Sequence, residues 1–103
     1  EPAELAAWLS DERRAKPLLL DVREPWEWQR ARIEGAQHIP MREIPARFGE
    51  LDPDQEVVAI CHHGGRSQQV AMFLEKNGFA KVHNLTGGVD AWSRTVDPAV
   101  PLY

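Results

Sequence analysis

The sequence has a single cysteine, Cys61, among its 103 residues. One cysteine cannot form an internal disulfide and cannot supply a multi-cysteine zinc site. Long apolar runs are also lacking, since the longest, such as residues 57–61, are far too short to cross a bilayer. No signal-peptide core is visible, although a leader could have been removed before Glu1. These absences predict a cytoplasmic protein with no membrane association.

Basic clusters are another absence. The chain has 12 Lys and Arg against 16 Asp and Glu, a net charge of −4, so general nucleic-acid binding is not expected. The composition, 43% hydrophobic and 27% charged, is ordinary for a globular protein. A chain of this length can build one core without disulfides, which predicts a single domain over residues 1–103. We expect it to be a monomer.

Hydrophobic patterning predicts alternating strands and helices. Strands are expected at residues 17–22, 37–39, 56–61 and 81–85, and helices at 4–10, 25–29, 44–51, 67–77 and in a short segment after Gly88. The run at 56–61 is continuously apolar, as expected for a central strand covered on both faces. The alternation predicts an α/β fold with a mainly parallel sheet. Ligands of such sheets bind at the carboxyl ends of strands, where Cys61 is placed.

The segment 61–67, Cys-His-His-Gly-Gly-Arg-Ser, combines features of a reactive cysteine site. Backbone N–H groups in such a loop can form an anion-binding nest, and the following helix directs the positive end of its dipole to the same point. Arg66 adds a permanent positive charge with no acidic neighbour in the loop, and Gly64 and Gly65 allow a tight wrap. These features predict a nucleophilic thiolate at Cys61, with a packing residue at a strand end as the alternative.

Four motifs follow one another along the chain. They are Leu-Leu-Asp-Val-Arg-Glu at 19–24, Ile-Glu-Gly-Ala-Gln-His-Ile-Pro at 33–40, the loop at 61–67, and Asn-Leu-Thr-Gly-Gly-Val-Asp-Ala-Trp at 84–92. In this order they resemble the single-domain rhodaneses, which are sulfurtransferases with a C-x-x-x-x-R-S active-site loop. The resemblance covers nearly the whole chain. It implies a three-layer α/β/α fold whose mainly parallel sheet has four to five strands.

The resemblance also implies the chemistry of the site. Cys61 would accept a sulfane sulfur from a donor such as thiosulfate, become a persulfide, and pass the sulfur to cyanide or a thiol. Arg66 would brace the loop and stabilise negative charge. Asp21 and Arg23 would lie near the loop, with structural ion pairing as an alternative role. The loop amides that would cradle the persulfide belong to His62, His63, Gly64, Gly65, Arg66 and Ser67. No metal or organic cofactor is implied. The expected partners are a small-molecule donor and acceptor or a thiol protein.

Two departures from the family pattern stand out. Arg32 occupies a position where the family often has histidine, and the chain begins almost at the first helix, so an edge strand before it is missing or very short. Neither departure affects residues 61–67.

Loop length separates the closest chemistries. Four residues lie between Cys61 and Arg66, whereas the phosphatases and arsenate reductases of the same fold have one more, which widens the loop for a tetrahedral oxyanion. The shorter loop favours sulfur transfer. A persulfide carrier or binding module for a partner protein stays open as an alternative.

The remaining histidines and tryptophans have competing interpretations. His62 and His63, when protonated, could favour the thiolate or recognise an acceptor, or they could be exposed side chains whose amides matter more. A metal site of Cys61, His62 and His63 is not expected, because adjacent side chains should point apart. His38 and His83 lie on expected strands and are interpreted as structural. Packing is expected for the tryptophans, with Trp26 or Trp28 as candidates for the mouth of the site.

Overall fold

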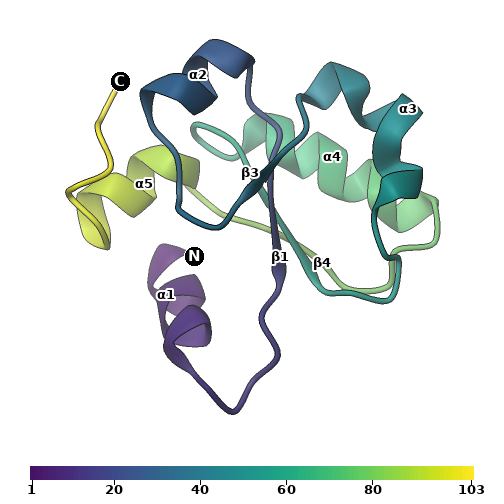
Figure 1. The fold of residues 1–103 in the computed structure, drawn as a ribbon, viewed down its shortest axis with the longest axis horizontal. Coiled ribbons are helices and arrows are strands. Elements are labelled where there is room, and N and C mark those ends of the chain that lie inside the picture. Colours follow the sequence, from purple (N-terminus) through teal and green to yellow (C-terminus); the bar gives the residue numbers. More distant parts are fainter.

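A four-stranded parallel sheet organises the computed structural model, which describes residues 1–103 (Figure 1). The strands are β1 (Leu18–Asp21), β2 (Gln37–His38), β3 (Val57–Ile60) and β4 (Val82–Asn84), in the spatial order β2-β1-β3-β4. All neighbouring pairs are parallel. The four predicted strands are confirmed, each slightly shorter than expected. No strand precedes the first helix, so the sheet has the smaller of the two expected strand numbers.

Five α-helices connect and cover the strands. They are α1 (Pro2–Ser10), α2 (Pro25–Arg30), α3 (Ile44–Arg47), α4 (Gly65–Lys76) and α5 (Gly88–Thr95). The predicted helical segment 44–51 is confirmed in part, because it is divided into a single α-helical turn, α3, and a 3₁₀ segment, η2 (Phe48–Glu50). A second 3₁₀ segment, η1 (Met41–Glu43), precedes α3. Gly49, a poor helix former, lies in η2. No helix is long and apolar enough to span a membrane.

Helices form a layer on each side of the sheet, and an apolar core lies between each layer and the sheet. Helices α1 and α5, which lie near each other in Figure 1, pack on Leu19 of β1 and Val58 of β3. On the opposite face, α3 and α4 cover Leu20 and Val57. Consecutive strand residues thus enter different cores, as the two-residue period of a strand requires. The expected three-layer α/β/α arrangement is confirmed.

Sheet topology places the candidate site. From β1 the chain moves outward to β2, whereas β3 lies on the other side of β1 and leads on to β4. The carboxyl ends of β1 and β3 therefore flank the point where the connections diverge, which is where α/β sheets form their ligand crevice. Asp21 ends β1 and Cys61 follows β3, so the chain brings both to this edge.

Candidate active site

Cys61 follows β3 directly, and only 1% of its surface is exposed. After it the chain turns sharply, and Gly64 adopts φ 111°, in the left-handed region that favours glycine. Because of this turn α4 begins at Gly65, two residues before the predicted start. The first helical amides, which have no partner within the helix, and the positive end of the helix dipole therefore lie beside the sulfur.

Hydrogen-bond donors surround the sulfur of Cys61. The Gly64 amide donates to Sγ at 3.0 Å and the Ser67 hydroxyl at 3.3 Å, and the amides of Arg66 and Ser67 contribute to the lowered pKa of the thiol. Burial opposes ionisation of the thiol. These hydrogen bonds, led by the Ser67 hydroxyl, outweigh that effect and lower the pKa of Cys61 below its ordinary value. The site thus favours a sulfur anion.

Asn84, at the end of β4, holds the loop in place and is missing from the predicted site. Its side-chain amide donates to the Gly64 carbonyl at 3.1 Å, and its side-chain oxygen accepts from the Ser67 hydroxyl. Ser67 thus has several acceptors, including Cys61 Sγ, for one hydroxyl proton. The available signal was its position at the carboxyl end of a strand, the edge where ligands bind.

In the folded chain Arg66 has an acidic partner, Glu27. Its guanidinium donates to both carboxylate oxygens of Glu27 in α2, at 2.5 and 2.8 Å, although no acid neighbours it within the loop. The Glu27 carboxylate is buried, and this ion pair fixes the start of α4 to α2. Sequence reasoning missed Glu27, because nothing local marks it as the partner of a residue 39 positions away.

Tyr103 joins the same network from the C-terminal segment. Its hydroxyl donates to Glu27 Oε2 at 2.8 Å and accepts from Arg23 Nη1 at 2.7 Å. Its ring stacks on His62 with centroids 4.1 Å apart. Burial, the largest effect, and the Glu27 contact raise the pKa of Tyr103 to about 12. The segment after α5 has no regular structure, as predicted, yet it reaches the site.

Asp21 and Arg23 form a buried ion pair at the end of β1. Arg23 Nε donates to Asp21 Oδ1 at 2.9 Å, and Nη2 donates to Oδ2 at 2.7 Å. Both residues are fully buried. Arg23 Nη1 donates to the Tyr103 hydroxyl and to the Glu27 carbonyl, and these two residues in turn contact His62 and Arg66 of the loop. This arrangement suits the structural role named as an alternative.

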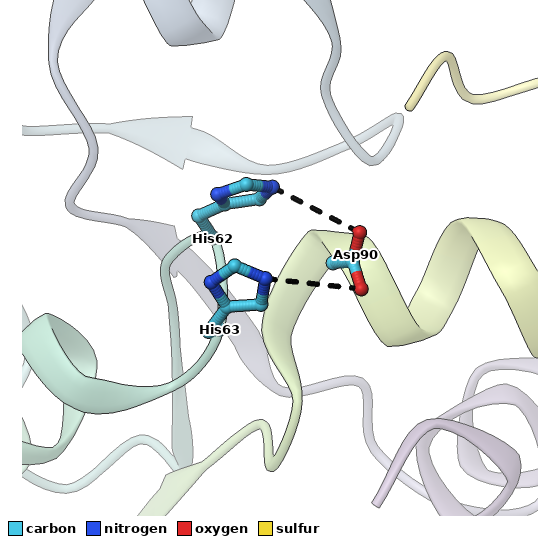
Figure 2. Close-up of side chains that lie close together, drawn as sticks. All are labelled: His62, His63 and Asp90. Atoms are coloured by element: carbon cyan, nitrogen blue, oxygen red, sulfur yellow. Dashed lines mark ion pairs between the residues drawn. The ribbon is translucent and has the colours of Figure 1, made fainter. Parts of the chain in front are cut away.

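His62 and His63 both turn toward Asp90 of α5, as Figure 2 shows. Each Nε2 lies 3.9 Å from an Asp90 carboxylate oxygen, and the two ring centroids are 4.0 Å apart. The expectation that these adjacent side chains point apart is therefore wrong. His63 is exposed, but the His62 side chain is only 20% exposed because its ring lies against Tyr103.

The other singled-out aromatic residues lie outside the cysteine loop. His38 Nε2 contacts the Arg23 carbonyl at 2.8 Å and its ring stacks on Trp28, while His83 pairs with Glu56. Trp26 is 61% exposed and meets the Tyr103 ring edge-on.

Comparisons with known proteins identify similar chains. The model of the rhodanese-like domain family matches residues 1–95. A sulfurtransferase of Allochromatium vinosum is 41% identical over 83 residues, which cover 81% of this chain and 78% of that protein. YrkF of Bacillus subtilis, named as a candidate sulfur carrier, is 43% identical over 75 residues, which cover 73% of this chain and 40% of that protein.

A solved structure shows the same fold. The rhodanese-like domain protein from Staphylococcus aureus superposes with a TM-score of 0.84 at 28% identity, covering 99% of this chain and 94% of that one. The chain spans only 30% and 40% of the length of two curated relatives that it matches. In those relatives the matching region is thus part of a longer protein.

Proposed function

Because this chain belongs to the rhodanese-like domain family, we propose that it transfers sulfane sulfur from a donor such as thiosulfate to a thiophilic acceptor through a persulfide on Cys61. The observation that carries the proposal is the Cys61 sulfur with its surrounding donors, the Gly64 amide at 3.0 Å and the Ser67 hydroxyl at 3.3 Å. Donors that stabilise a thiolate also suit the anionic terminal sulfur of a persulfide.

The first step charges the enzyme. The Cys61 thiolate attacks the outer sulfur of thiosulfate and forms a new sulfur–sulfur bond. The bond between that sulfur and the sulfonate breaks, and sulfite leaves with its electron pair. Cys61 then carries a persulfide anion, and no oxidant or proton is consumed.

The second step removes the sulfur from the Cys61 persulfide. An acceptor such as cyanide attacks the terminal sulfur, and the bond to Cys61 breaks with its electron pair returning to the cysteine. Thiocyanate leaves and the thiolate is regenerated. Because one covalent intermediate connects the two steps, the kinetics should be ping-pong. Arg66 acts as a brace that positions the loop amides, since both its Nη atoms are engaged by Glu27.

A carrier role is the second candidate, supported by the likeness to YrkF. In that role Cys61 would receive its sulfur from a persulfide on a partner protein and pass it to another. Phosphatase or arsenate reductase chemistry is disfavoured, because only four residues separate Cys61 from Arg66 and the shorter loop leaves less room for a tetrahedral oxyanion. We further propose that the protein works as a monomer in the cytoplasm, where reducing conditions keep a lone thiol free.

Intact mass spectrometry tests the proposal. Incubation with thiosulfate should add one sulfur atom, about 32 Da, as a covalent cysteine intermediate requires. Cyanide should remove it, and Cys61→Ser should never gain it. Charging by a persulfide-bearing protein but not by thiosulfate would favour the carrier role. A mass gain of one sulfur atom in Cys61→Ser would contradict both the sulfurtransferase role and the carrier role.

A further inference from the structure

We propose that His62, His63 and Asp90 form a binding site for a divalent transition metal ion, best matched by Zn²⁺, at the rim of the cysteine loop. Figure 2 shows the two imidazole rings and the carboxylate facing one another. Their ligand atoms all lie within 4.8 Å of one another. The set excludes Cys61, so the site does not depend on sulfur transfer.

The spacing of the ligand atoms fits a shared ion better than a direct contact. Each His Nε2 is 3.9 Å from an Asp90 oxygen, too far for a hydrogen bond. Two ligands of one tetrahedral zinc, each about 2.1 Å from the metal, are about 3.4 Å apart. Each ring nitrogen must approach its Asp90 oxygen by about half an ångström, and the three ligand atoms, which lie within 4.8 Å of one another, must also draw together to share one ion.

A buried ring nitrogen without a partner points to the same place. His62 Nε2 is shielded from solvent and has no hydrogen-bond partner, although it faces Asp90. Stacking on Tyr103, with planes 15° apart, holds the ring in this orientation. Buried polar atoms are nearly always satisfied in native proteins, so an unpaired nitrogen aimed at a carboxylate calls for a ligand between them.

The backbone fixes the ligands relative to each other. The Asp90 amide donates to the His62 carbonyl at 3.1 Å, and the Val89 amide donates to the Cys61 carbonyl at 2.9 Å. This close approach depends on Gly88, because a Cβ there would collide with both carbonyls. Metal binding therefore requires little reorganisation of the loop against α5.

The chemistry of the three groups selects the class of metal. Imidazole and carboxylate ligands suit zinc, and three protein ligands leave a fourth position for water. Arg94 Nε donates to Asp90 Oδ2 at 3.0 Å and orients the carboxylate, as groups behind metal ligands commonly do.

Zinc titration of the untagged, EDTA-stripped and desalted chain tests the site. Affinity is measured in competition with a chromogenic chelator, and Co²⁺ absorption reports tetrahedral geometry. The wild type should bind one Zn²⁺. His63→Ala and Asp90→Asn should weaken binding more than about tenfold. His83→Ala, which removes a histidine that pairs with Glu56 outside the proposed site, and Cys61→Ser should bind like the wild type, with circular dichroism confirming that every variant is folded.

Two results would overturn the proposal. If binding is lost in Cys61→Ser but kept in Asp90→Asn, the thiol is the ligand. If Asp90→Asn and the wild type bind Zn²⁺ equally, or if the wild type shows no Zn²⁺ binding in the chelator competition, the three residues do not form a metal site.

Discussion

The Glu27–Arg66 ion pair makes the stability of the fold depend on pH. Burial opposes ionisation of Glu27, but hydrogen bonds from Arg66, the Glu24 amide and Tyr103 lower its pKa from 4.5 to about 2. A folded-state pKa below the unfolded value means that the carboxylate stabilises the fold above pH 4.5 and ceases to do so as the pH falls toward 2. This difference corresponds to about 3 kcal/mol of unfolding free energy at pH 7 and about 1 kcal/mol at pH 3.

Glu27→Gln removes this contribution, because the neutral amide resembles the protonated acid and turns an NH₂ group toward donors. Urea unfolding should show a loss of about 3 kcal/mol at pH 7 that shrinks to about 1 kcal/mol at pH 3. Glu50→Gln is the matched control. It breaks a pair between Arg47 and a 53% exposed Glu50, and should cost less than about 1 kcal/mol at either pH. An equal loss for Glu27→Gln at both pH values would refute the electrostatic argument and leave packing as the cause.

Further substitutions test other contacts of the site. Ser67→Ala deletes a donor to Cys61 and should raise the pKa of the thiol, so alkylation by iodoacetamide at pH 7 should slow about fivefold, while Ser10→Ala should leave it unchanged. Gly88→Ala should cost more than about 2 kcal/mol in urea unfolding, since its Cβ meets two carbonyls. Gly35 also has a positive φ of 87°, but no atom lies near the position of an added Cβ, so Gly35→Ala should cost only about 1 kcal/mol. Equal losses of unfolding free energy for Gly88→Ala and Gly35→Ala would show that backbone strain, and not the collision with the carbonyls, is the cause. Asp21→Asn breaks a buried ion pair and should cost about 3 kcal/mol, against under about 0.5 kcal/mol for exposed Asp54→Asn. A small loss for Asp21→Asn would mean that Arg23 finds other partners.

The order of elements could be predicted because it rests on local signals. The apolar run that predicts β3 and the amphipathic pattern that predicts α4 each lie within one short stretch of sequence. Cys61 at the carboxyl end of β3 follows from the same boundary. The segment 44–51 was predicted less well, because its apolar spacing is helical while Gly49, a poor helix former, lies where the α-helical turn gives way to a 3₁₀ segment.

The residues that complete the site could not be predicted, because they meet only after the fold has formed. Glu27 and Arg66 are 39 residues apart, and Tyr103 reaches Glu27 from the end of the chain. The two adjacent histidines illustrate a second reason. Neighbouring side chains diverge in a strand, but His62 and His63 lie in a turn, which swings both rings toward α5.

The tertiary contacts also change how the proposed chemistry is supported. Arg66 was expected to supply positive charge to the sulfur, yet its charge is compensated by Glu27, and the charge of Arg23 is compensated by Asp21. The groups that contact an anion at Cys61 are neutral dipoles, namely amides, the Ser67 hydroxyl and the N-terminus of α4, while the charge of Arg66 acts on the sulfur at longer range. In the proposed cycle a thiolate and a persulfide anion alternate, each with one negative charge. Because the same dipoles stabilise the thiolate and the persulfide anion to a similar degree, neither state is strongly favoured over the other. Sulfur can therefore be both accepted and released.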